Sequence, residues 1–387
     1  MDSDLVVRLT REMVRMRSVN PPGDERPVAE YLATEARQSG LEAELQELDV
    51  GRSNCVVRLP GGDAPALVFT GHLDVVPPGE QAWEHDPFGA DLADGRVYGR
   101  GSADMKGGVA AILAAMIGLR STGFHPAGDV VLAATAGEEA GLYGARAMVD
   151  RASLQGAGYL VVAEPSDLNV FVAEKGVLWM DVHYYGRTAH GSMPWLGVNA
   201  VSAMARLIPV LEAYPFRFEE SPILGKPTLS VNVIGGGNKT NVVPDHCRIV
   251  LDMRTVPTQD HAVLIDEVRR QAEAVARASN QEIRVDITVD QNDRSVETNP
   301  EEPLVQAMAA SVRAVTGQEP RIEGVTYATD AAVLAPGFKI PMVICGPGAP
   351  GMAHQPDEWV AVEQLTQAAE AYADLARRLP GPAETSR

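Results

Sequence analysis

The chain has few cysteines and no concentration of positive charge. Only three of its 387 residues are cysteines, Cys55, Cys247 and Cys345, and none stands in a CxxC spacing. The sequence therefore predicts neither a disulfide framework nor a thiolate zinc site. The formal net charge is -19, and no cluster of lysine and arginine interrupts it. A nucleic-acid-binding face, which must neutralise phosphates, is not expected.

Two further absences concern export and membranes. Residues 1–5 lack the basic-then-apolar order of a signal peptide. No apolar run approaches the length of a membrane span. With 45% hydrophobic and 22% charged residues, the composition is that of a globular protein that buries a core. We therefore expect a cytoplasmic protein.

Short apolar runs that end abruptly in small or polar residues occur in the first and last thirds of the chain. They are residues 66–70, 130–135, 160–163 and 341–345. Runs of this length suit strands that are buried on both faces of a sheet. Residues 107–119 form an almost wholly apolar helical pattern, which should also be buried. These two thirds predict an α/β domain with a mostly parallel sheet.

The middle third has a different pattern. It predicts, in order, strand 177–185, helix 198–214, strands 228–234 and 247–254, helix 261–278 and strand 282–289. The order β-α-β-β-α-β is that of a ferredoxin-like sandwich. We therefore predict that residues 1–175 and 291–387 form one domain, into which residues 176–290 are inserted as a second.

Acidic residues and histidines follow the apolar strands. In chain order these residues are His72, Asp74, Asp104 (directly before the apolar helix), Glu138, Glu139, Glu164 and His354. In an open α/β sheet, ligands bind at the carboxyl ends of the strands. Solubility alone would not require four strand ends to carry carboxylates and imidazoles. We therefore expect these side chains to converge on one site.

Imidazoles and carboxylates without a thiolate suit zinc or a similar divalent metal. Two ions that share one carboxylate would need five ligands, and the sequence supplies His72, Asp104, Glu139, Glu164 and His354. Asp74, two residues from His72, would accept the other ring N–H of that histidine. Glu138 is left over beside a ligand, so we expect it to be the general base.

Each feature alone has a simpler interpretation. A histidine and an aspartate at a strand end can be structural, and His354 in a Pro/Gly loop can be a surface histidine. Glu138 and Glu139 can mark a helix N-terminus, where the helix dipole favours carboxylates. The conjunction of all of them favours a metal centre.

A series of motifs extends over essentially the whole chain. They are TGHLDVVP (70–77), WEHDPF (83–88), GRVYGRGSADMKGG (95–108), TAGEEAGLYGA (135–145), AEPS (163–166), TAHGSMPWLGVNA (188–200), NVVPD (241–245), LDMRTVP (251–257) and GMAHQPDEWV (351–360). In these motifs and their order the chain resembles the zinc-dependent amidohydrolase family of aminoacylase, acetylornithine deacetylase, succinyl-diaminopimelate desuccinylase and carboxypeptidase G.

The resemblance implies two Zn²⁺ per subunit, with Co²⁺ as a substitute. His72 and Glu164 would bind one ion, Glu139 and His354 the other, and Asp104 would bridge them. Asp74 and Glu138 would have the supporting and general-base roles given above. The inserted domain would be a lid that also carries dimerisation.

Three lid residues match substrate-contacting positions of the family. His190 matches a histidine that reaches the substrate carbonyl, often from the partner subunit, although it can also be a surface histidine at a strand end. Asn241 and Arg254 match positions that contact the carboxylate or carbonyl of the substrate. A guanidinium can give a carboxylate two parallel hydrogen bonds, but Arg254 can equally be the partner in a structural salt bridge.

The resemblance implies a homodimer that hydrolyses the amide bond of an N-acyl amino acid, releasing a short acyl group such as acetyl or succinyl. A carboxypeptidase or dipeptidase with the same site is the alternative. A non-catalytic binding protein would have lost a ligand or Glu138, and a phosphate- or nucleotide-handling enzyme would need a phosphate-cradling glycine loop. Residues 324–331 keep Thr329-Asp330-Ala331 but not the family's preceding glycines, so the identity of the substrate is not carried over.

Overall fold

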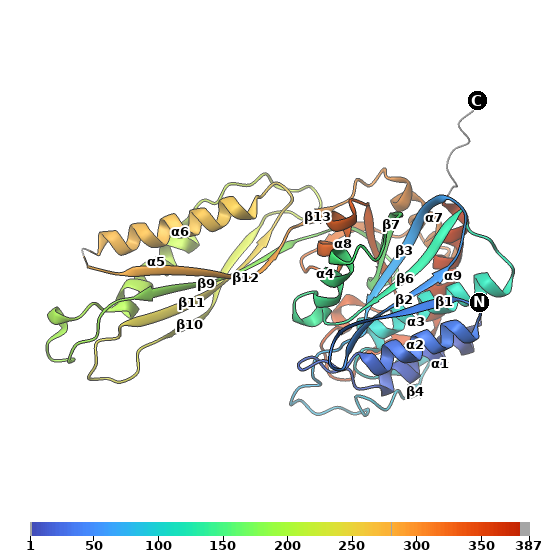
Figure 1. Ribbon diagram of the computed structural model, residues 1–387, viewed down its shortest axis with the longest axis horizontal. Helices are drawn as coiled ribbons and strands as arrows, with labels where there is room; N and C mark the ends of the chain where they lie inside the picture. Colours follow the sequence, from blue (N-terminus) through green and yellow to red (C-terminus); the bar gives the residue numbers. More distant parts are fainter. Residues whose placement is uncertain (1, 280, 380–387) are drawn as a thin grey trace. The chain divides into compact units, whose positions relative to one another are not determined.

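The computed structural model describes residues 2–279 and 281–379, which separate into two compact units (Figure 1). Unit 2 comprises Glu174–Val296 and Val325–Ala328, and unit 1 comprises the rest. The predicted inner domain, 176–290, starts and ends a few residues inside unit 2. The short segment Val325–Ala328 was not assigned to it. The last eight residues of the predicted outer domain lie outside the described residues.

Unit 1 is built on a nine-stranded sheet with the strand order β1-β2-β6-β3-β7-β15-β8-β13, in which β14 also pairs with β8. The strands are β1 (Glu42–Asp49), β2 (Arg52–Leu59), β3 (Ala64–His72), β6 (Gly128–Thr135), β7 (Ala157–Pro165), β8 (Val170–Glu174), β13 (Val296–Glu297), β14 (Ile322–Val325) and β15 (Met342–Gly346). A smaller sheet joins β16 (Trp359–Ala361), β5 (Arg96–Tyr98) and β4 (Leu92–Ala93).

The large sheet is mixed, which corrects the prediction of a mostly parallel sheet. Its four middle strands, β6, β3, β7 and β15, are parallel. In contrast, β1 with β2, β2 with β6, and β15 with β8 are antiparallel. Only two residues connect β1 to β2, and so short a connection can join only antiparallel strands.

The four apolar runs of the sequence are the four parallel strands, as predicted. Nearly all of their residues are buried. Since they are parallel neighbours, their carboxyl ends meet at one edge of the sheet. This edge is where the predicted site residues begin.

The helices of unit 1 cover the sheet. They are α1 (Ser3–Arg15), α2 (Arg26–Gln38), α3 (Gly107–Ser121), α4 (Tyr143–Asp150), α7 (Pro303–Thr316), α8 (Ala331–Phe338) and α9 (Val362–Arg378). The predicted apolar helix is α3, and it starts so close to β7 that a Cβ at Gly108 would lie 2.2 Å from the Ala163 carbonyl oxygen. Within the described part of the chain, one helical stretch, Ser102–Ser121, is long and apolar enough for a membrane span. Of its most apolar 18-residue segment, 89% is buried inside the protein. It is a core helix, as its pattern predicts.

Unit 2 contains the six predicted elements in the predicted order. They are β9 (Gly176–Tyr185), α5 (Ala200–Ala213), β10 (Thr228–Gly236), β11 (His246–Thr255), α6 (His261–Ala278) and β12 (Arg284–Asp293). The strands form a sheet of order β10-β11-β9-β12, with antiparallel pairs throughout. This is the strand order of a ferredoxin-like sandwich.

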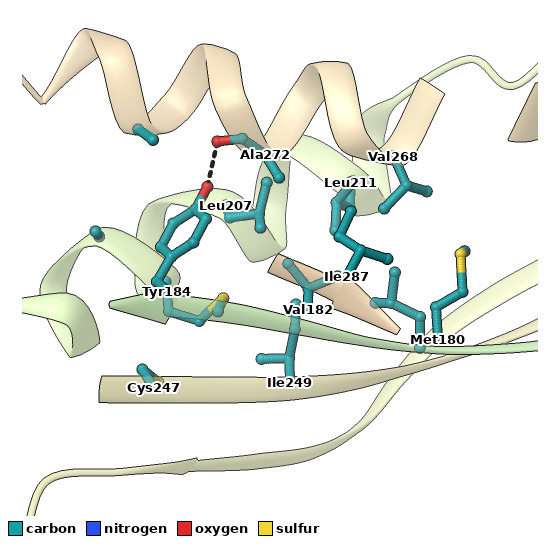
Figure 2. Close-up of a cluster of buried hydrophobic side chains, with 14 of the residues drawn as sticks. Met180, Val182, Tyr184, Leu207, Leu211, Cys247, Ile249, Val268, Ala272 and Ile287 are labelled. Atoms are coloured by element: carbon teal, nitrogen blue, oxygen red, sulfur yellow. Dashed lines mark hydrogen bonds between the residues drawn. The ribbon is translucent and has the colours of Figure 1, made fainter. Parts of the chain in front are cut away.

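The core of unit 2 follows from the alternation of β9. Met180, Val182 and Tyr184 point toward α5 and α6 and are fully buried, as Figure 2 shows. The Tyr184 hydroxyl donates a hydrogen bond of 2.5 Å to the Ala272 carbonyl of α6. The helices therefore cover one face of this sheet.

Candidate metal centre

Four of the five predicted ligands are placed by the ends of four neighbouring strands. His72 is the last residue of β3, and Glu164 is next to last in β7. After β6 the chain turns at Gly137, whose φ of 74° favours glycine, and continues into a short 3₁₀ turn, Glu138–Ala140. His354 follows the 3₁₀ turn Pro350–Met352, beyond β15. Because these strands are parallel neighbours, all four positions lie at the same edge of the sheet.

Asp104 lies between the two histidines. Its Oδ1 is 3.0 Å from His72 Nε2, and its Oδ2 is 3.4 Å from His354 Nε2. A glutamate accompanies each imidazole: Glu164 Oε1 is 3.5 Å from His72 Nε2, and Glu139 Oε1 is 3.0 Å from His354 Nε2. The structure thus brings together all five predicted ligands, in two groups that share one carboxylate.

The two groups differ in burial. In the first, His72, Glu164 and Asp104 are buried. In the second, the side chain of His354 is 52% exposed. A small molecule can therefore approach the centre from the His354 side.

The charges in this centre perturb one another strongly. Burial alone would lower the pKa of His72, but the hydrogen bond with Asp104 and the charge of Glu164 raise it well above its usual value. Hydrogen bonds to Asp104 and Glu139 raise the pKa of His354 to about 10. Burial, together with the charge of Asp104, raises the pKa of Glu164 well above its usual range. Several carboxylates packed this closely favour a cation among them.

The donor set fits divalent zinc or a similar ion. Each group offers one imidazole nitrogen and carboxylate oxygens, and the ligand atoms of each group lie within 4.8 Å of one another. The ligand atoms of His72, Glu138 and Glu139 form a third set that also lies within 4.8 Å. Geometry alone therefore admits Glu138 as a ligand as well as a base.

Asp74 has a different contact from the one predicted. The hydrogen bond of His72 Nδ1, 2.9 Å long, goes to the main-chain carbonyl of Asp74, and the nearer carboxylate oxygen is 3.6 Å away. A carbonyl only accepts, so Nδ1 carries a proton, and Nε2 is the nitrogen that faces the other predicted ligands. The predicted tautomer is therefore held, but by the backbone and not by the carboxylate.

The carboxylate of Asp74 instead fixes the loop that follows β6. It accepts hydrogen bonds from three successive amides: Gly137 N at 3.0 Å, Glu138 N at 3.1 Å and Glu139 N at 3.2 Å. Its Oδ2 also accepts one from the amide of Asn20, at 2.8 Å. Asp74 thereby orients the backbone of both glutamates.

Glu138 lies beside the centre and is only partly buried. Burial, with the charges of Glu164 and Glu139, raises its pKa well above the usual range, even though His72 opposes the shift. A carboxyl group with a raised pKa beside a metal centre suits proton transfer.

The three predicted substrate contacts lie in unit 2, at opposite ends of its sheet. His190 forms a bridge with Val242, and Gly191 N donates to the Asn241 carbonyl at 2.7 Å, so His190 and Asn241 adjoin. Arg254 lies near the other end of β11. The eight residue steps from the start of β11, at about 3.4 Å each, put Arg254 roughly 27 Å from that end. The structure therefore does not bring Arg254 together with the other two.

The guanidinium of Arg254 has a partner within its own strand. Its Nε and Nη2 donate to the two carboxylate oxygens of Asp252, at 2.8 and 3.2 Å. The salt-bridge interpretation of Arg254 therefore describes the structure.

Sequence reasoning missed three residues around the centre. They are Asn20, which holds Asp74; Asp330, whose Oδ2 accepts from Thr135 Oγ1 at 2.5 Å; and Glu358, which is fully buried. Burial raises the pKa of Asp330 to about 6. Glu358 stands in a motif quoted for the family resemblance, and Asp330 in the part of residues 324–331 that keeps the family pattern, so an acid in such a segment was the available signal.

Comparison with known proteins gives consistent matches along the chain. The model of peptidase family M20/M25/M40 matches residues 68–378. The succinyl-diaminopimelate desuccinylase of Paracoccus denitrificans is 32% identical over 386 residues, which cover 96% of this chain and 97% of that protein.

Solved structures share the fold. A tripeptidase from Staphylococcus aureus has a TM-score of 0.80 at 23% identity and covers 97% of this chain and 99% of its own. A dinuclear metal-binding peptidase of the M20 family from Bacillus subtilis has a TM-score of 0.73 at 17% identity and covers 97% of each chain. Because the family model spans most of its length, this chain belongs to peptidase family M20/M25/M40.

Proposed function

We propose that the protein is a cytoplasmic enzyme that uses two divalent cations to hydrolyse the amide bond of an N-acyl amino acid, releasing a short acyl group such as acetyl or succinyl. The observation that carries the proposal is Asp104, whose two oxygens face two different imidazoles. Membership of the M20 family and the name of the Paracoccus relative support the reaction class.

Five side chains would hold the cations. His72 and Glu164 would bind one ion, Glu139 and His354 the other, and Asp104 both. Zinc suits these donors, and cobalt can take its place. When bound, the cations would polarise the scissile carbonyl and lower the pKa of the attacking water to about 7.

Glu138 is the proton carrier in this proposal. Its amide is fixed by Asp74, which sets the carboxylate beside the ligand cluster. It takes a proton from the attacking water and gives it to the nitrogen of the departing amine. The proton that the Asp74 carbonyl holds on Nδ1 makes Nε2 the nitrogen of His72 that would bind the cation, with loss of any proton there.

We propose further that unit 2 is a lid and dimerisation domain, and that the partner subunit's His190 completes the site. The chain enters unit 2 at Glu174 and leaves it at Val296, and Val177 pairs with Asp293 and Arg254 at that same end. The nine residue steps along β9, at about 3.4 Å each, carry the chain roughly 30 Å away before the His190 loop begins. His190 and Asn241 would therefore serve the site of the partner.

A mixed-dimer experiment tests this division. Dimers that combine a His190→Ala chain with a Glu138→Ala chain contain one site with both residues intact, if His190 acts across the interface. We expect such dimers, purified with two different tags, to recover about half of wild-type activity per dimer, whereas each parent homodimer stays nearly inactive. Mixed dimers as inactive as the parents would place His190 in the site of its own chain.

Carboxypeptidase or dipeptidase activity is the second candidate function. Solved structures with this fold include a tripeptidase, and the same centre could cleave a peptide bond. Release of free amine should be measured for N-acetyl and N-succinyl amino acids and for dipeptides, with enzyme reconstituted with zinc or cobalt. We expect kcat/KM to be at least about tenfold higher for acyl amino acids, a difference of roughly 1.4 kcal/mol in transition-state binding. The reverse order would make the protein a peptidase.

A further inference from the structure

Glu358 is a fully buried carboxylate that binds the loop carrying Asp104. Its Oε1 accepts hydrogen bonds from three main-chain amides of that loop: Gly101 N at 3.0 Å, Ala103 N at 2.9 Å and Asp104 N at 3.0 Å. Its Oε2 accepts one from Arg100 Nη1 at 2.5 Å. Glu358 is 0% and Arg100 2% exposed, so solvent does not weaken these bonds.

The same pair also holds the segment that carries His354. Arg100 Nη1 donates to the carbonyl of Gln355 at 3.2 Å, one residue after His354. The main-chain carbonyl of Glu358 accepts from Gly99 N at 2.8 Å. Glu358 and Arg100 therefore tie together two chain segments that deliver ligands to the same group.

Asp104 needs such support because its own backbone is irregular. Its φ of -117° and ψ of 92° are not helical, although α3 begins three residues later. No helical repeat therefore fixes the direction of its side chain, which must point one oxygen at each imidazole. Hydrogen bonds to a charged carboxylate are roughly twice as strong as neutral ones, and metal sites need their ligands held to within about 0.5 Å.

The arrangement repeats the one found at Asp74. There a buried carboxylate accepts three amides of the loop that carries Glu138 and Glu139. Here another accepts three amides of the loop that carries Asp104. Each loop is thus set by an acid that faces backbone amides and not the cluster.

We propose that Glu358, held by Arg100, is a positioning residue that sets the geometry of Asp104 between the two cation sites. The proposal rests on the proposed two-metal function. Removing the carboxylate should free the Asp104 loop and weaken metal binding at both sites, and most at the half-exposed His354 side.

Titration of the metal-free enzyme with Co²⁺ tests this inference, followed by the visible absorption of bound cobalt. Glu358→Gln keeps one oxygen that can accept from the three amides. It loses the negative charge and places an NH₂ group, which cannot accept, where Oε2 accepts from Arg100. We expect the dissociation constant of the more weakly bound cobalt to rise about 10- to 100-fold, the range seen when a residue supporting a metal ligand is removed. At saturating cobalt, kcat should remain reduced, with KM changed less than about threefold.

Two other variants separate positioning from folding. Glu358→Asp keeps the charge and should be the milder change, with metal affinity between those of the wild type and Glu358→Gln. As a control, Glu35→Gln breaks the two-pronged pair between Arg8 and Glu35, at 3.0 and 2.8 Å on the surface of unit 1, and should leave both cobalt affinities within about twofold. Thermal unfolding of each metal-free variant reports the stability cost by itself.

The outcomes are distinct. Glu358 variants with normal cobalt affinities and a lowered melting temperature would overturn the inference, since Glu358 would then only stabilise the fold. Wild-type enzyme that takes up fewer than two cobalt ions would instead overturn the proposed function.

Discussion

Glu138→Ala should retain two metal ions per chain and lose nearly all turnover. The side chain is outside the two groups of ligands centred on Asp104, so both groups stay complete. Removing a general base costs about 100- to 10,000-fold in rate, and we expect kcat to fall by that factor, with KM changed little. Steady-state kinetics and metal analysis of the same purified sample measure both quantities.

The adjacent residue provides a matched control. Glu139→Ala removes the carboxylate that lies 3.0 Å from His354, so it should reduce metal content together with activity. Of the two neighbouring substitutions, Glu138→Ala would then lower turnover alone, and Glu139→Ala would lower both metal content and turnover. Activity of Glu138→Ala within a few-fold of wild type would rule it out as the base, and loss of metal from that variant would make it a ligand.

His72→Ala should lose metal as well as activity. His72 is 1% exposed, and its Nε2 is close to both Asp104 and Glu164, so its removal takes the imidazole from one group of ligands and leaves only carboxylates there. We expect metal affinity to fall by more than about 100-fold, beyond the range typical of supporting residues. Equilibrium dialysis against zinc at fixed concentration measures the change.

His261→Ala is the control for burial. His261 is also 1% exposed, but it lies in unit 2 and binds Thr255 and Asn292. Its removal should lower thermal stability and leave the metal content at two ions per chain. If His72→Ala kept its full metal content, His72 would not be a ligand.

The sequence predicts the location of the centre because its strands are easily recognised. Four apolar runs of strand length, each followed by an acid or a histidine, predict neighbouring buried strands that share one edge. His72 at the end of β3 and Glu164 at the end of β7 follow directly from this rule. The elements of unit 2 are equally clear, since Met180, Val182 and Tyr184 alternate along β9.

The supporting contacts could not be predicted in the same way. Whether the carboxylate or the carbonyl of Asp74 meets His72 depends on the course of the chain after β3, which no periodicity encodes. Glu358 lies more than 250 residues from the amides that it binds, and nothing local in the sequence indicates such a pair. The antiparallel pairing of β1 with β2 depends on a two-residue turn after β1, and the patterns of the flanking strands did not show it.

Anomalous diffraction from crystals of the zinc-reconstituted enzyme is the most direct test of the central claim, that one centre holds two cations around Asp104. We predict two zinc peaks per chain, about 3.5–4 Å apart. One should lie against His72 and Glu164, the other against Glu139 and His354, and Asp104 should contact both. A single peak, or a pair in which Asp104 touches only one ion, would contradict the account.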